Sequence, residues 1–119
     1  MSESPVPIID EEALMMMVGG NGDLLREIVR HFLDDYPTYL GRLVTAIAAG
    51  DRLKVERTAH TLRGAILNFH APGAAGRARI IEQLARDGDL AEAPHLVHAL
   101  QTELGEVARA LQALCESKS

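Results

Sequence analysis

One histidine in this chain stands in a setting suited to phosphoryl chemistry. His60 is followed by Arg63 three residues later and by Gly64 four residues later. Residues three, four and seven positions apart share one face of a helix, so His60, Arg63, Gly64 and Leu67 are predicted to lie together. Imidazole is partly deprotonated near neutral pH and can attack phosphorus. A guanidinium can pair with phosphoryl oxygens, and a glycine leaves room for a second protein to approach.

The apolar residues around His60 predict the helix that carries it. They step by four, three, four and three, which is the buried stripe of an amphipathic helix: Val55, Ala59, Leu62, Ile66 and Phe69. At about 100° per residue, His60 points roughly 140° away from the centre of that stripe and is expected to face water. Asp51 is predicted to cap this helix, and Pro72 to follow its end.

The remaining periodicity predicts further helices and no strands. A short first helix is expected after Asp10 and before Gly19, with the methionine run 15–17 as adaptable core. A second helix begins near Gly22, ends at Gly50, and should kink or restart at Pro37. The side chains expected to point inward from this helix are Leu25, Ile28, Val29, Phe32, Leu40, Leu43, Val44 and Ile47.

The C-terminal half predicts two more helices. One runs from about Gly73 to Arg86 and buries small residues that permit close approach of a neighbour. The last has Pro94 in its first turn. Its apolar residues step by three and four, as bundle packing requires: Val97, Leu100, Leu104, Val107, Leu111 and Leu114.

The sequence 59–64, Ala-His-Thr-Leu-Arg-Gly, followed by Asn68 and Ala71, resembles the signature of histidine-containing phosphotransfer (HPt) domains of bacterial multistep phosphorelays. The similarity continues in the turn at 49–51, in Ile81-Glu82 and Arg86, and in the turn at 88–90. Two positions depart from the family pattern, which usually has glycine at His70 and a small residue near Leu67.

The resemblance implies a fold and a set of roles. The fold is all-α, an antiparallel four-helix bundle with a short additional N-terminal helix. His60 is then the phospho-acceptor, Arg63 stabilises phosphoryl charge, and Gly64 is the gap beside His60. Leu67, on the same face, is a candidate contact for partner docking.

The resemblance also implies partners. The phosphoryl group comes from the receiver-domain aspartyl phosphate of a hybrid histidine kinase and passes to the receiver aspartate of a response regulator. Magnesium, needed to neutralise phosphoryl charge, would be supplied by the receiver, with no intrinsic cofactor or metal. The chain lacks a Gly-x-x-x-x-Gly-Lys-[Ser/Thr] loop, so we expect a phosphoryl carrier rather than a kinase.

Composition is compatible with this interpretation. The 119 residues predict one domain over 9–115, a flexible leader over 1–8 and a disordered tail over 116–119. With 12 Lys and Arg against 17 Asp and Glu, the net charge of −5 argues against nucleic acid or anionic membrane as the main partner. Cys115 is the sole cysteine, and the leader has no basic region, so a cytoplasmic location is expected. A monomer is expected, because one histidine per bundle suffices for a carrier.

Two other functions stay open. One is a phosphorylation-independent helical interaction module that binds a receiver or kinase domain through the Leu67 face. The other is a small metal-dependent hydrolase, since Glu92, His95 and His98 follow a Glu-x-x-His-x-x-His spacing. His70 is a rival phospho-acceptor, but Pro72 separates it from the residues that would be its helical neighbours.

Overall fold

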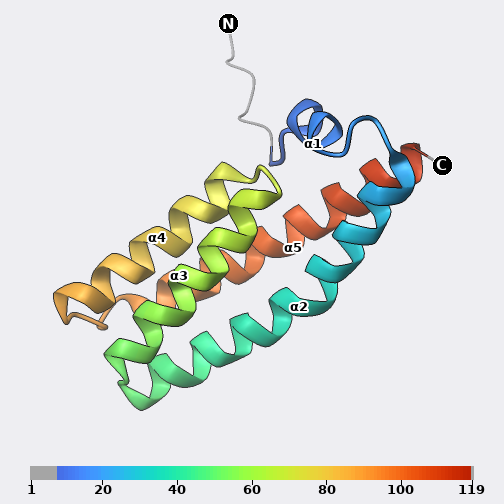
Figure 1. Cartoon of the computed structure of the whole chain (residues 1–119). Helices are drawn as coiled ribbons and strands as arrows, with labels where there is room; N and C mark the ends of the chain where they lie inside the picture. Colours follow the sequence, from blue (N-terminus) through green and yellow to red (C-terminus); the bar gives the residue numbers. More distant parts are fainter. Residues whose placement is uncertain (1–7, 119) are drawn as a thin grey trace, which may run out of the picture.

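The chain folds into five α-helices with no strand among residues 8–118, the part that the computed structural model describes. A short α1 (Glu11–Met17) precedes α2 (Gly22–Ala49), α3 (Arg52–Asn68), α4 (Pro72–Asp87) and α5 (Ala93–Ser117). Helices α2 to α5 run alternately up and down, and α1 sits at one end (Figure 1). Each long helix packs against the next, and α5 closes the bundle against α2. The predicted all-α, antiparallel four-helix bundle with an extra N-terminal helix is confirmed.

The core is built from the apolar stripes of these helices. All six residues predicted to point inward from α5 are buried, and so are the five of the His60 stripe. Burying a side chain of this size contributes about 1.5–3 kcal/mol. Small residues in α4, among them Ala74, Ala78 and Ala85, are buried and allow close packing against α3. Among the described residues, no helix is both long and apolar enough to cross a membrane.

Local signals set the helix boundaries. Asp10, Asn21 and Asp51 each accept a hydrogen bond from the backbone N–H three residues later, at 3.0–3.1 Å. Such caps satisfy N–H groups that the first helical turn leaves without partners. Gly50 ends α2 in the left-handed conformation, with φ of 69°. The turn at 50–51 therefore fixes where α3 begins, and with it the orientation of His60.

A kink or a restart was predicted at Pro37. The helix does not restart, because α2 is one helix of 28 residues with Pro37 inside it. It bends in its middle, as the predicted kink requires (Figure 1). Pro37 lies on the exposed side, where water can satisfy the carbonyl that loses its partner. Beyond the bend the buried stripe continues by steps of three to Ala46, so Val44 is 44% exposed rather than buried as predicted.

Two other expectations need correction. Met16 and Met17 are 75% and 45% exposed, so most of the methionine run is not core. The short α1 presents only one face to the bundle, and Leu14 and Val18 occupy it. The predicted disordered tail is also wrong in part, since α5 extends to Ser117. The predicted leader, apart from residue 8, lies outside the described residues.

His70 has a backbone conformation that penalises its side chain. With φ of 53°, it is the one non-glycine residue with positive φ among the described residues. Its N–H donates to the carbonyl of Leu67, and its own carbonyl accepts from the N–H of Asp10. The bend after α3 therefore joins the start of α1 to the end of α3. A left-handed conformation costs a residue with a Cβ about 1–2 kcal/mol, which explains why glycine suits this position.

We expect His70→Gly to raise the free energy of unfolding by about 1 kcal/mol, because relief of the left-handed strain exceeds the entropy that glycine adds to the unfolded chain. Urea denaturation followed by circular dichroism measures the gain. His70→Ala is the matched control, since alanine keeps a Cβ and should bring no gain. Equal stability of the two variants would contradict this account of His70.

Candidate functional site

The four residues singled out in the sequence lie on one exposed face of α3. The His60 side chain is 64% exposed, as its predicted angle from the buried stripe requires. Leu67 is 48% exposed on the same face. Gly64 lies between them, and a Cβ added there would meet nothing within 4 Å. The helix itself therefore has no packing reason for a glycine at this position.

A buried carboxylate from α4 holds the site together. Glu82 is 5% exposed, the one buried charged residue among those described. Its Oε1 accepts a hydrogen bond from Arg63 Nε at 2.9 Å. Its Oε2 lies 2.9 Å from His60 Nδ1 and accepts from Arg86 Nη2 at 3.1 Å. One carboxylate thus joins three basic side chains from two helices.

Electrostatics keep the Glu82 carboxylate ionised. Burial acts to raise its pKa, but hydrogen bonds from His60 and Arg63 and their charges outweigh burial, so the pKa lies below its ordinary value of 4.5. An ionised carboxylate only accepts hydrogen bonds, so the proton between Glu82 and His60 must be on Nδ1. The neutral imidazole then has its lone pair on Nε2, at the exposed side of the ring.

Arg63 is anchored beside the imidazole. Its Nη2 lies 3.0 Å from His60 Nδ1. Both groups are donors once Nδ1 carries the proton, so we assign the hydrogen bond of Nδ1 to Glu82 and treat the Arg63 approach as a close contact. The ion pair with Glu82 therefore fixes the guanidinium next to the ring. Arg63 was predicted to lie near His60, but its bond to Glu82 was not.

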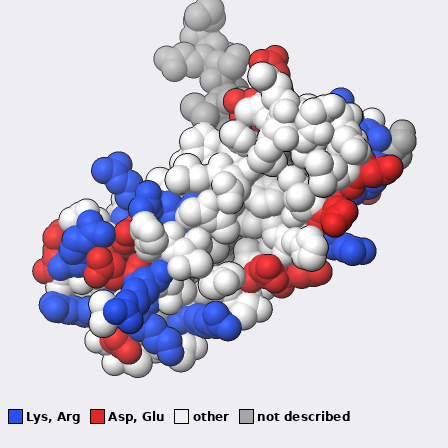
Figure 2. All heavy atoms as spheres, viewed as in Figure 1, with Lys and Arg blue, Asp and Glu red and all other residues white. Residues whose placement is uncertain are grey.

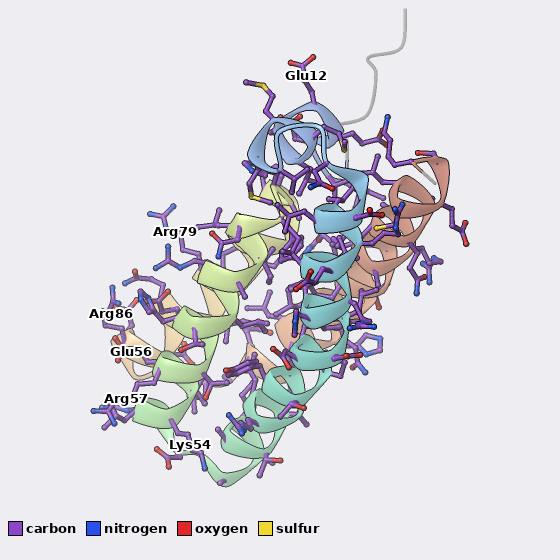
Figure 3. The ribbon with its side chains drawn as sticks, turned by 45° about the vertical axis from the view of Figure 1, so that its right-hand side comes forward. Glu12, Lys54, Glu56, Arg57, Arg79 and Arg86 are labelled. Atoms are coloured by element: carbon purple, nitrogen blue, oxygen red, sulfur yellow. The ribbon has the colours of Figure 1, made fainter. Side chains whose placement is uncertain are left out.

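A second ion pair ties the end of α4 to α3. Arg86 Nε donates to Glu56 Oε2 at 3.0 Å, and this bond raises the pKa of the guanidinium. Because Arg86 also bonds to Glu82, the network spans Glu56, Arg86, Glu82, Arg63 and His60. Glu56 and Arg86 meet on one side of the α3–α4 pair (Figure 3).

The network lines an open hollow between α3 and α4. The hollow has a volume of about 690 Å³ and is bounded by His60, by four arginines and by two glutamates. Figure 2 shows basic side chains gathered at the end of the bundle where α3 begins and α4 ends, with acidic side chains among them. In the lining of the hollow the arginines outnumber the glutamates by two. The exposed imidazole nitrogen therefore faces a basic recess that an anionic group can enter.

Glu82 and Arg86 were not predicted as site residues, although both lie in segments that resemble the HPt family. A signal for Glu82 is present in the sequence. It falls four residues after Ala78 and three before Ala85, on the buried stripe of α4. A carboxylate on an apolar stripe is costly unless it is paired, so such a position points to a buried ion pair.

The metal-binding alternative has no geometric support in the described residues. Within residues 8–118, no three His, Cys, Asp or Glu side chains are placed together so that they could hold a metal ion, and this includes Glu92, His95 and His98. His70, the rival acceptor, lies beyond the end of α3 and outside the network that holds His60.

Comparison with known proteins identifies the family. The sequence model of the Hpt domain matches residues 27–116. The chain belongs to the Hpt domain family. A similar solved structure is that of histidine-containing phosphotransfer protein B (HptB) from Pseudomonas aeruginosa PAO1, with a TM-score of 0.87 and 26% identity. The alignment covers 95% of this chain and 98% of that one. A comparison with curated protein sequences finds no match.

Membership of the Hpt family supplies the general activity. Hpt domains carry phosphoryl groups between receiver domains and kinases in phosphorelays, and they are carriers rather than kinases. The helical architecture, the exposed histidine and the basic hollow are all compatible with such a carrier.

Proposed function

We propose that this protein accepts a phosphoryl group on Nε2 of His60 from a receiver-domain aspartyl phosphate of a hybrid sensor kinase and passes it to a response-regulator aspartate. The observation that carries the proposal is the bond between His60 Nδ1 and buried Glu82. It holds the imidazole in the tautomer whose exposed nitrogen is nucleophilic. The single cysteine and the lone acceptor histidine are compatible with a cytoplasmic monomer.

The transfer is a displacement at phosphorus. The Nε2 lone pair forms the N–P bond while the bond from phosphorus to the aspartyl oxygen breaks, and the electron pair leaves with the receiver carboxylate. The Nδ1 proton stays between His60 and Glu82, where the carboxylate stabilises the positive charge that the ring gains. Passing the group to a second aspartate reverses these bond changes. Magnesium bound by the receiver neutralises phosphoryl charge, and this chain contributes no metal ligand.

Arg63 adds positive charge beside the reacting group. The Nε of the Arg63 guanidinium donates its hydrogen bond to Glu82, so the two terminal nitrogens can pair with phosphoryl oxygens. Its side chain is only 27% exposed, so little side-chain freedom is lost when the phosphoryl group arrives.

A side chain at position 64 should stabilise the helix, and a large one should slow phosphoryl transfer. Because a Cβ there meets nothing, Gly64→Ala should stabilise the helix by about 1 kcal/mol. Gly64→Gln should slow transfer from a receiver about tenfold or more, as loss of about 1.4 kcal/mol of docking energy would. Gly41 on α2 is also helical with open space around it, so Gly41→Gln is the control. Transfer to Gly64→Gln at the wild-type rate would show that the partner does not need the space beside His60 that Gly64 leaves open.

Phosphoryl transfer between purified proteins tests the proposal. Phosphorylated receiver domains from hybrid kinases are mixed with the chain and magnesium, and label on the chain is followed in time. A second, unphosphorylated receiver is then added. Label should pass to the chain and on to the second receiver. Stable receiver binding without any transfer would instead favour the alternative, a phosphorylation-independent helical interaction module.

A further inference from the structure

The hollow beside His60 is basic although the whole chain is acidic. Four arginines and two glutamates line it, an excess of two positive charges, whereas the chain carries a net charge of −5. The excess of positive charge lies in the hollow between α3 and α4, and Figure 2 shows most of the visible basic side chains at this end of the bundle, with acidic ones among them. A local field of this sign attracts anionic groups to the hollow even though the protein as a whole would repel them.

The four arginines divide into two pairs. Arg63 and Arg86 are committed to Glu82 and Glu56. Arg57 and Arg79 are exposed and make no salt bridge with any residue from 8 to 118. One comes from α3 and the other from α4, and both border the hollow. Figure 3 shows both on the same side of the molecule as the Glu56–Arg86 pair.

The surface that meets this hollow during transfer must carry negative charge. In the proposed reaction the partner delivers a phosphoryl group from a carboxylate and binds magnesium through further carboxylates. Arginine suits such a partner, because its planar fork pairs with carboxylate oxygens. Exposed charges at the rim of an interface act mainly on the association rate and partner choice, and their effect weakens with salt.

We infer that Arg57 and Arg79 steer the acidic face of a receiver domain onto His60. The inference rests on the proposed function and adds to it the two residues that speed association with the partner. Arg63 and Arg86 organise the site, and Arg57 and Arg79 provide the charge that a partner meets first.

A second groove, between α2 and α5, provides a matched control. It is lined by Val29, Arg30 and Leu33 of α2 and by Gln112 and Cys115 of α5. It lies across the bundle from the α3–α4 hollow, because α3 packs against α2 and α4 whereas α5 packs against α4 and α2. Arg30 borders that groove, and Arg109 is exposed on α5. Neither makes a salt bridge within residues 8–118. The variant Arg30→Glu/Arg109→Glu therefore changes the net charge of the protein as much as Arg57→Glu/Arg79→Glu does, but away from the α3–α4 hollow.

The test is the salt dependence of phosphoryl transfer. The probe is whichever phosphorylated hybrid-kinase receiver domain labels the wild type fastest, and kcat/KM is measured from about 0.05 M to 0.5 M NaCl. The double variant Arg57→Glu/Arg79→Glu should lose at least about tenfold in kcat/KM at low salt. Its value should approach that of the wild type at high salt. Arg57→Gln/Arg79→Gln should fall between the two, and thermal unfolding confirms that each variant is folded.

Three outcomes would overturn the inference. The first is an unchanged kcat/KM and salt slope in Arg57→Glu/Arg79→Glu. The second is an equal loss in Arg30→Glu/Arg109→Glu, which would show that net charge alone matters. The third is absence of transfer from every receiver to the wild type, which contradicts the proposed function itself and is thereby distinguished from the other two.

Discussion

Replacing His60 by glutamine abolishes phosphoryl acceptance and leaves the bundle intact. The glutamine amide cannot form the N–P bond, so transfer from a phosphorylated receiver should fall below detection. Stability should change by no more than about 0.5 kcal/mol, because the His60 side chain is exposed and Glu82 keeps Arg63 and Arg86 as partners when the imidazole is replaced. Incorporation of labelled phosphate, with thermal unfolding of the same samples, measures both quantities.

Two other histidines serve as controls for this result. His70→Gln and His95→Gln should accept phosphate as the wild type does, since neither residue takes part in the Glu82 network. Undiminished incorporation in His60→Gln, or loss of incorporation in His70→Gln, would mean that the acceptor lies elsewhere.

Glu82→Met should slow phosphoryl acceptance by roughly 10²-fold, the effect of a misplaced reacting group. The change removes the acceptor that fixes Nδ1–H, so the imidazole can rotate and exchange tautomers. Glu82→Gln keeps an oxygen that can accept from Nδ1, and should restore part of the rate. Single-turnover transfer from a saturating receiver measures this chemical step separately from docking.

Glu82→Met should lose phosphoryl transfer without a matching loss of folding stability. The carboxylate is buried, but its three partners are at least partly exposed, so removing Glu82 strands no buried charge. The unfolding free energy should therefore stay within about 1 kcal/mol of the wild type. Glu103→Met is the matched control, because it removes a carboxylate paired with Arg77 on α4, away from His60. A transfer defect in Glu103→Met equal to that in Glu82→Met would refute a specific role for Glu82.

The lowered pKa of Glu82 adds a pH dependence to the same comparison. A carboxyl group with a pKa below its ordinary value of 4.5 stabilises the fold above that pH, and the contribution is lost as pH falls through the folded-state value. Wild type should therefore lose stability relative to Glu82→Met as pH is lowered from about 6 to about 3. Urea denaturation of both proteins at each pH measures the difference. A constant difference over this range would show that Glu82 is not held ionised by its partners.

Much of the fold follows from local sequence signals. The capping residues Asp10 and Asp51, the left-handed Gly50 and the α5 stripe set helix boundaries and buried faces with few alternatives. At Pro37 the helix bends but does not restart, because packing on both sides of it, through Phe32 and Leu40, holds one helix together despite the lost hydrogen bond. The low helix propensity of this one proline is outweighed by the burial of many side chains along α2.

The candidate site was predictable only where it lies on one helix. His60, Arg63, Gly64 and Leu67 share a face of α3, and helical periodicity is enough to place them together. Glu82 and Arg86 reach the site from α4, which depends on how α3 and α4 pack. Periodicity gives the buried face of a helix but not its neighbour across the interface, so the network could not be derived from spacing alone.

The position of the phosphoryl group within the phosphorylated protein decides whether His60 is the acceptor. Peptide mass mapping under conditions that preserve N–P bonds locates the residue, and phosphorus and imidazole nitrogen NMR identify the bonded nitrogen. We expect phosphate on Nε2 of His60, with Nδ1 still protonated toward Glu82. Phosphate on Nδ1, or on any other residue, would contradict it.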